Sequence, residues 1–169
     1  LLAPGKSLEY QWDRVRDYIR EKDAIPVSAN FYFEEQQGGY AFFSNAKRYD
    51  SYRAFRNPRE HVILTSNITR GVGEEDDVVS YGRLAQDGRP TENCGVLLLR
   101  LMRLLGAKEA ALAGFDGYST GQDNYMKGYF GEYHSARSAD NEEIAEEIRE
   151  VGRSLPVTFL TPSLYEEAV

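Results

Sequence analysis

His61-Val62-Ile63-Leu64-Thr65, which Ser66-Asn67 follows, is the stretch of sequence that decides the fold. From Val62 to Thr65 it consists of β-branched and apolar residues, which is typical of a strand buried on both faces. Other short apolar runs are residues 1–3, 25–29, 40–43, 110–113 and 157–160, and residues 78–81 form a weaker one. Because unbroken apolar strands are typical of parallel sheets, we expect a parallel sheet covered by helices on both faces.

Helical patterns lie between these strands. Residues 8–19 and 144–155 carry apolar side chains at helical spacing, and residues 96–105 are apolar nearly all round apart from Arg100 and Arg103. The residues expected to cap these helices are Ser7, Asn93 and Asp140, the last with Glu143 at capping-box spacing. The sequence therefore predicts an α/β fold: a single Rossmann-like, doubly wound domain over 1–169, its sheet mostly parallel, with helices on both faces.

Composition narrows the classes of function. A net charge of −7 argues against a nucleic-acid binder that is held by phosphate contacts. It leaves room for a small phosphorylated ligand, which needs only one local basic region. The sequence contains no run of about 18 apolar residues, the length needed to cross a membrane. Its single cysteine, Cys94, is interpreted as a packing residue and suits the reducing cytoplasm. Since Leu1 already lies in a strand-like run, we expect a domain cut from a longer chain.

Polar and glycine residues follow each strand. In a parallel sheet these endings meet at one edge, where open α/β sheets bind ligands. The candidate ligand-binding residues there are Gly5, Lys6, Ser7, Asn30, Ser44, Asn45, Ser66, Asn67, Gly114, Asp116 and Gly117. Short amides and hydroxyls suit a base, a sugar hydroxyl or a carboxylate. The alternative is that such residues simply end strands, which is the better interpretation for any single loop.

Two basic features could hold an anion. Lys47 and Arg48, the first of a basic stretch that continues with Arg53, Arg56 and Arg59, are candidates to bind a phosphate or an acidic acceptor. The alternative is a solvated helix face. Gly5-Lys6-Ser7 is too short for a P-loop, whose first glycine would precede Leu1. A tight glycine turn into a helix can still hold an anion without that motif.

His134 is the candidate general base. It lies in the Tyr-, Gly- and Ser-rich segment 129–135, which is suited to fold over a site as a lid. A histidine there has a pKa suited to proton transfer near neutral pH, and the alternative is a lid residue without a catalytic role. No His, Cys and carboxylate cluster has metal-ligand spacing, so we expect neither a metal nor another cofactor.

Several stretches together resemble the C-terminal domain of bacterial aldolase-type proteins of the HMG-CoA-lyase-like group, often labelled 4-hydroxy-2-oxovalerate aldolases. They are Ala3-Pro4-Gly5-Lys6-Ser7, Phe43-Ser44-Asn45-Ala46-Lys47-Arg48-Tyr49, Thr65-Ser66-Asn67, Leu112-Ala113-Gly114-Phe115-Asp116-Gly117 and Phe159-Leu160-Thr161-Pro162-Ser163-Leu164-Tyr165. The resemblance implies a non-catalytic accessory domain, covalently fused to an aldolase-like barrel upstream that would carry any aldolase activity.

The order of motifs also resembles the family-42 bacterial sialyltransferases. Gly5, Ser7 and Leu8 match the opening of that family, although Ala3 and Lys6 replace a glycine and a proline. Further matches are Phe31-Tyr32-Phe33-Glu34, Asn45 and Gly114-Phe115-Asp116-Gly117-Tyr118. This resemblance implies a nucleotide-sugar ligand and a metal-independent glycosyl transfer, with Tyr118 and Tyr125 on the phosphate and His134 as the base. The sequence leaves open which of the two functions applies.

Overall fold

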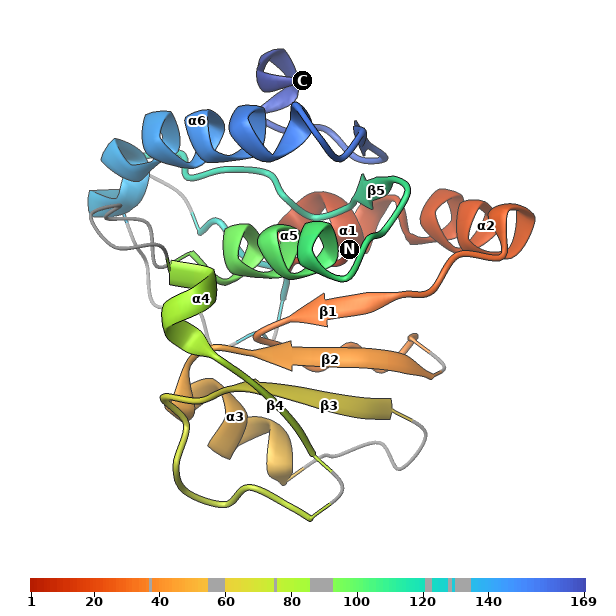
Figure 1. The fold of residues 1–169 in the computed structure, drawn as a ribbon. Coiled ribbons are helices and arrows are strands. Elements are labelled where there is room, and N and C mark those ends of the chain that lie inside the picture. The colour runs from red at the N-terminus through yellow and green to blue at the C-terminus, as the bar shows by residue number, and fades with distance from the viewer. Residues whose placement is uncertain are drawn as a thin grey trace.

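The computed structural model of the chain (Figure 1) describes residues 1–36, 38–54, 60–74, 76–85, 93–120, 123–127, 129 and 135–169. Four parallel strands pair in chain order: β1 (Val27–Ala29), β2 (Gly39–Phe43), β3 (Glu60–Thr65) and β4 (Asp77–Val79). A second parallel pair consists of β5 (Ala110–Leu112) and β6 (Val157–Phe159). The predicted mostly parallel, Rossmann-like arrangement is confirmed.

Residues 1–3 join the two sheets. Leu2 forms parallel bridges to Ser28 in β1 and to Ala113, the residue after β5. Its backbone nitrogen donates to the Val27 carbonyl at 2.8 Å, and the Ala3 nitrogen donates to the Ala113 carbonyl at 2.9 Å. The strands therefore lie in the order β6, β5, residues 1–3, β1, β2, β3, β4. The direction of winding reverses at residues 1–3, which makes them the switch point of the sheet.

Helices cover both faces of the sheet. Phe42 of β2 packs with Leu97 and Leu98 of α5 (Cys94–Leu104) on one face. Its neighbours Ala41 and Phe43 point the other way, toward α3 (Ala46–Arg53). This alternation is the expected consequence of the pleat of a strand. The same face as α3 is covered at its other end by α1 (Lys6–Tyr10) and α2 (Trp12–Lys22).

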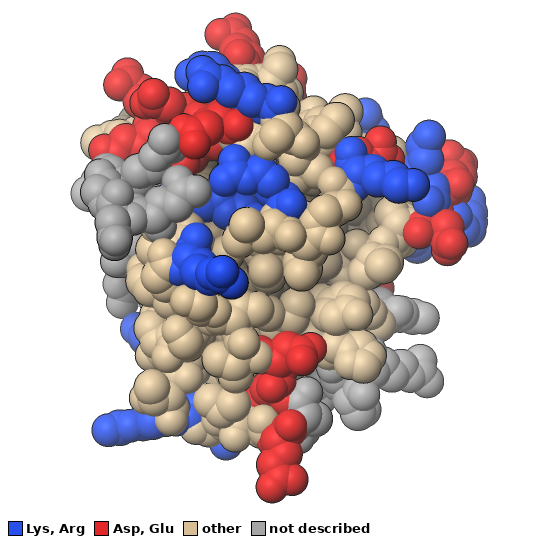
Figure 2. Space-filling view, in the orientation of Figure 1, with Lys and Arg blue, Asp and Glu red and all other residues tan. Residues whose placement is uncertain are grey.

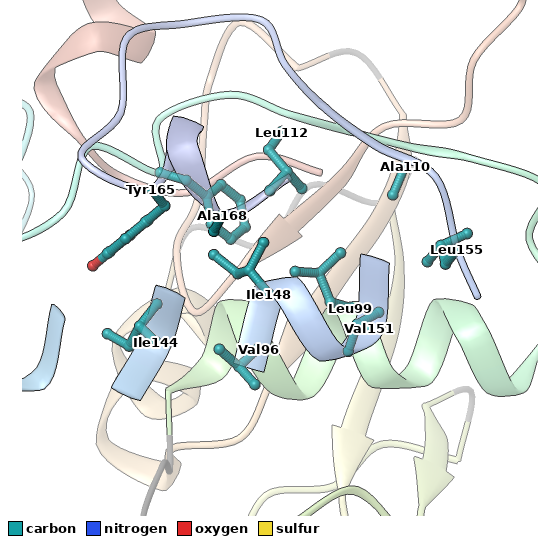
Figure 3. Close-up of a cluster of buried hydrophobic side chains, with 11 residues drawn as sticks. Val96, Leu99, Ala110, Leu112, Ile144, Ile148, Val151, Leu155, Tyr165 and Ala168 are labelled. Atoms are coloured by element: carbon teal, nitrogen blue, oxygen red, sulfur yellow. The ribbon is translucent and has the colours of Figure 1, made fainter. Parts of the chain in front are cut away.

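The largest buried cluster lies between α5, α6 (Asn141–Gly152) and β5 (Figure 3). Val96 and Leu99 of α5 meet Ile144 and Ile148 of α6, and Leu112 closes the cluster from the sheet. All five side chains are buried, which explains why their apolar spacing was visible in the sequence. The cluster fixes α5 over the sheet and so fixes the position of the residues at the start of α5.

A buried ion pair joins the same two helices. Arg100, which is only 1% exposed, donates from Nη2 to Oε2 of Glu147 at 2.5 Å. Its Nη1 donates to the carbonyls of Leu84 at 2.7 Å and Ala85 at 3.2 Å, at the end of α4 (Tyr81–Ala85). Arg100 therefore connects α4, α5 and α6, although it is a charged residue within an otherwise apolar helix.

Four local predictions were wrong. Ser7 does not cap a helix: α1 already begins at Lys6, and Gln11 separates α1 from α2. Asp140 stands before α6 but makes no side-chain capping hydrogen bond, because the 3-10 helix Ser135–Asp140 already leads into α6. The second strand begins at Val27, and Ile25 is 68% exposed. Tyr81 starts α4 and does not extend β4.

The helices of the described residues are all too short or too polar to cross a membrane. Figure 2 shows acidic side chains gathered over α6, whereas α2 carries side chains of both signs. On α2, Asp13 pairs with Arg16 at 2.8 Å and Asp17 with Arg20 at 3.2 Å. These exposed pairs contribute little to stability.

Candidate functional site

A cavity of about 660 Å³ opens at the edge of the sheet where the strands end. Its walls come from the loops that follow residues 1–3, β1, β2, β3 and β5, and from the start of α5. In Figure 1 this edge lies on the left, where the arrows of β1 and β2 point. The volume is within the usual range for small-molecule sites, about 300–1,000 Å³. The cavity thus lies beside the switch point, where open α/β sheets bind ligands.

Most of the predicted site residues line this one cavity. They are Gly5, Asn30, Ser44, Asn45, Lys47, Arg48, Asn67, Gly114, Asp116, Gly117, Tyr118 and Tyr125. Lys6, Ser7 and Ser66 are not part of its wall. Ser66 instead accepts a hydrogen bond from the Tyr81 nitrogen at 3.1 Å, so it holds the start of α4. His134, Arg56 and Arg59 lie outside the described residues.

Asp116 lines the polar floor of the cavity near the end of β5, and Ser7, which lies outside the cavity wall, supports it through two hydrogen bonds. The Ser7 nitrogen donates to Oδ2 of Asp116 at 2.8 Å, and the Ser7 hydroxyl donates to Oδ1. The Oγ atoms of Ser7 and Thr161 lie 2.7 Å apart, and Thr161 Oγ1 also accepts from the Gly114 nitrogen at 2.9 Å. The floor therefore connects the start of α1, the end of β5 and the end of β6.

The surroundings of Asp116 shift its pKa upward. Burial raises the pKa of Asp116 above 3.8, while the hydrogen bonds from Ser7 and the charge of Lys6 lower it by less. Gly5 and Gly114 allow this close packing. A Cβ atom on Gly5 would overlap the Gly114 carbonyl and the Asp116 carboxylate, and one on Gly114, at φ +73°, would overlap the Ala3 carbonyl.

Asparagines hold the loops at the ends of β1 and β2. Asn30 has a left-handed backbone, φ +61°, and its Oδ1 accepts from the Ser44 nitrogen at 3.0 Å. Asn45 caps α3, because its Oδ1 accepts from the Arg48 nitrogen at 3.1 Å. Asn67 lies one strand further and donates from Nδ2 to the Ser44 carbonyl at 3.1 Å. The same residue type thus shapes three neighbouring loops of one cavity.

Tyr118, Tyr125 and Tyr129 also line the cavity. The Tyr118 and Tyr125 rings meet edge to face with centroids 6.5 Å apart, and the Tyr125 and Tyr129 centroids are 5.1 Å apart. Cζ of Arg48 lies 4.8 Å from the centroid of Tyr129, a cation–π arrangement. The Tyr129 hydroxyl donates to the Asn30 carbonyl at 2.8 Å, and burial raises the pKa of Tyr129. Tyr129 therefore positions the Arg48 guanidinium beside the cavity.

Sequence reasoning missed several lining residues, among them Asn93, Cys94, Asn124 and Tyr129. Asn93 was visible only as a helix cap, which it is: its Oδ1 accepts from the Gly95 and Val96 nitrogens. The signal that could have placed it is that a helix after a strand of such a sheet begins at the ligand-binding edge. Burial raises the pKa of Cys94 to about 12, so its thiol stays neutral and suits packing rather than nucleophilic attack.

Within the part of the chain that the structure describes, no group of three or more His, Cys, Asp or Glu side chains could hold a metal ion. The described cavity wall instead offers amides, hydroxyls, one carboxylate and two cationic side chains. Comparisons of the chain with known protein families, curated proteins and solved structures find no match. Any assignment of function therefore rests on the chemistry of this cavity.

Proposed function

We propose that the chain is a binding domain for a small phosphorylated ligand of the nucleotide or nucleotide-sugar class. The observation that carries the proposal is the convergence of five strand ends on one cavity of about 660 Å³ at the switch point. Lys47 and Arg48 are the cationic side chains of its described wall, in a chain whose net charge is −7. A local basic group in an acidic protein favours one anionic group on the ligand rather than a polyanion.

The rest of the wall suits the uncharged part of such a ligand. The rings of Tyr118 and Tyr125 can contact a planar base or a sugar face, while their hydroxyls can donate to a phosphate next to it. Asp116 has acceptor oxygens that can receive hydrogen bonds from hydroxyl or amino groups. A cavity with mixed aromatic and polar walls is the usual form of a specific small-molecule site.

In a catalytic form of this function, His134 removes the proton from an acceptor hydroxyl. The acceptor oxygen then bonds to the anomeric carbon of the donor sugar, and the bond from that carbon to the phosphate oxygen breaks. The electron pair stays on the departing phosphate, where hydrogen bonds from Tyr118 and Tyr125 would strengthen as negative charge develops. This role for the two tyrosines and His134 follows the resemblance to family-42 sialyltransferases, and it needs no metal.

A thermal-shift screen of nucleoside monophosphates, nucleoside diphosphates and CMP-linked sugars tests the proposal. A ligand at one hundred times its dissociation constant should stabilise the folded chain by about 2.7 kcal/mol. Calorimetric titration of each hit then gives the stoichiometry, expected to be one ligand per chain. If no compound in the panel shifts the unfolding temperature or binds in the calorimeter, the proposed function is wrong.

A further inference from the structure

Three asparagines of the cavity have a fixed orientation. Asn30 accepts from the Ser44 nitrogen, Asn45 from the Arg48 nitrogen, and Asn93 from the nitrogens of Gly95 at 2.8 Å and Val96 at 3.2 Å. A backbone N–H can only donate, so the side-chain atom that meets it must be the amide oxygen. The Oδ1 atom of each of these asparagines is therefore already engaged by the backbone.

The other half of each amide is then an NH2 group. The Nδ2 atoms of Asn30, Asn45 and Asn93 make no hydrogen bond with any residue that the structure describes, and all three residues line the same cavity. Two other lining asparagines differ. Asn67 and Asn124 donate from Nδ2 to the carbonyls of Ser44 and Ser119, each at 3.1 Å.

The three asparagines belong to one region of the cavity. Asn30 and Asn45 follow the paired strands β1 and β2, and Asn30 bonds directly to the residue before Asn45. Asn93 precedes Cys94, whose Sγ lies 3.9 Å from the Phe42 carbonyl of β2. The cations of the wall, Lys47 and Arg48, lie in the first turn of α3, directly after its cap Asn45. Asp116 lies beyond residues 1–3, at the end of β5.

We propose that Asn30, Asn45 and Asn93, together with Arg48, form an oxyanion subsite that holds the phosphate of the ligand at the β1–β2 end of the cavity. NH2 and guanidinium groups offer donors only, and a phosphate offers acceptors only. The opposite end, where Asp116 supplies acceptors, takes a hydroxyl- or amine-bearing part. This subsite rests on the proposed function, because it assumes that the cavity binds a phosphorylated molecule.

Substitutions that keep the capping oxygen but remove the NH2 group distinguish a role in phosphate binding from a role in capping the helix. Asn45→Asp and Asn93→Asp keep the capping oxygen but replace the NH2 donor by a second, negatively charged acceptor. Asp caps helices as well as Asn does, and a negative charge at a helix start is favourable, so both variants should fold with at least wild-type stability. Asn45→Ser also keeps a capping oxygen and removes the donor without adding charge.

The matched control is Gln11→Glu. Gln11 is the N-cap of α2 and lies outside the cavity wall, so this change adds the same charge at a helix start elsewhere. Calorimetric titration with CMP and with cytidine then measures the contribution of the phosphate. CMP should bind the two Asp variants at least tenfold more weakly than it binds wild type, while cytidine should bind all the proteins within about twofold, given the usual strength of hydrogen bonds to charged groups. Asn45→Ser should fall between wild type and Asn45→Asp, and Gln11→Glu should match wild type.

Unchanged CMP affinity in Asn45→Asp and Asn93→Asp would overturn the subsite, and so would equal losses for CMP and cytidine. Side-chain amide NMR with inorganic phosphate keeps the test independent of the nucleotide. The NH2 signals of Asn30, Asn45 and Asn93 should shift saturably, whereas those of Asn67 and Asn124 should not. Such shifts without any nucleotide binding would retain the subsite and reject the proposed function; their absence would reject the subsite.

Discussion

Ser7 and Asp116, which are 109 residues apart in the chain, are joined by two hydrogen bonds. The Ser7 backbone nitrogen and hydroxyl each donate to a different oxygen of the carboxylate. The pair connects the first loop of the chain to the end of β5, across the switch point of the sheet. The floor of the cavity therefore depends on a contact that can form only when both halves of the sheet are assembled.

Replacing Ser7 by Ala should lower the free energy of unfolding by about 1–3 kcal/mol, because it removes the part-buried hydroxyl that donates to Oδ1 of Asp116 and lies 2.7 Å from Oγ1 of Thr161. Ser51→Ala is the control. Its hydroxyl donates to the Lys47 carbonyl on an exposed helix face, so its loss should cost no more than about 0.5 kcal/mol. Urea unfolding measures both values, and equal values for the two variants would contradict a structural role for the Ser7 hydroxyl.

Asp116 should make stability depend on pH in a defined direction. Burial raises the pKa of Asp116 in the folded chain above its ordinary value of 3.8, so the folded state holds the proton more tightly than the unfolded state. The stabilisation from this group is fully present below pH 3.8 and is lost as the pH rises through the raised pKa. Asp116→Asn does not titrate. The advantage in unfolding free energy of wild type over this variant should shrink from about pH 3 to about pH 7. A difference that stays constant over this range would show that the folded carboxyl is not perturbed.

Removing one member of the Arg100–Glu147 pair should lower the free energy of unfolding strongly, whereas replacing both members by apolar residues should lower it less. Glu147→Leu or Arg100→Met removes one member of the buried pair while the other charge stays buried, and each should cost about 3–5 kcal/mol. The double change Arg100→Met with Glu147→Leu removes both charges and should cost less than the sum of the single changes. Chemical unfolding of the four proteins of this cycle measures the coupling, and additive losses would mean that the two side chains do not stabilise each other.

Lys47 and Arg48 should act on ligand affinity rather than on stability. Removing both by substitution with Ala should weaken binding of a phosphorylated ligand by about 1.5–3 kcal/mol for each charged hydrogen bond lost. Arg20→Ala on exposed α2 removes a cation far from the cavity and should leave the affinity unchanged. If the double variant binds CMP as tightly as wild type does, the basic pair is only a solvated helix face.

A substitution at His134 tests whether the chain is an enzyme or only a binding module. If the chain transfers sugar from a CMP-linked donor, His134→Ala should lower kcat about 10²–10⁴-fold and leave the affinity for the donor nearly intact. Radiolabelled-sugar transfer and calorimetry on the same preparations give the two quantities. Donor binding without transfer or hydrolysis by the wild-type chain would contradict the catalytic role. It would favour the accessory-domain function that the aldolase resemblance implies.

The sheet and its ligand edge were predictable because each depends on local pattern. Apolar runs such as His61 to Thr65 mark parallel strands whatever their partners, and the polar residues that follow them must then share an edge. Asn45 was recognisable as a site candidate at a strand end, whereas Asn93 was recognisable only as a helix cap. The orientation of their side-chain amides could not be predicted, because it depends on which backbone N–H groups the folded loops present to them.

Tertiary partners account for what the sequence could not show. Ser7 precedes an apolar helical stripe and so favours a capping role, but Asp116 engages both its hydroxyl and its nitrogen. Arg100 interrupts an apolar helix, and only the packing of α6 reveals that Glu147 meets it. Tyr129 was visible only as part of the predicted lid segment 129–135, and its contacts with Arg48 and the Asn30 carbonyl are set by the tertiary fold.

Mapping of a bound nucleotide by backbone-amide NMR tests the central claim most directly. Titration with CMP should shift, saturably and with one dissociation constant, the amides of Gly5, Asn30, Asn45, Gly114 and Tyr118, which the cavity brings together from separate loops. A second, mostly apolar cavity of about 840 Å³ involves α2 and the end of α5, and its residues Val15, Ile19 and Leu101 should not respond. Shifts confined to that second cavity, or no saturable shifts at the strand ends, would contradict the account.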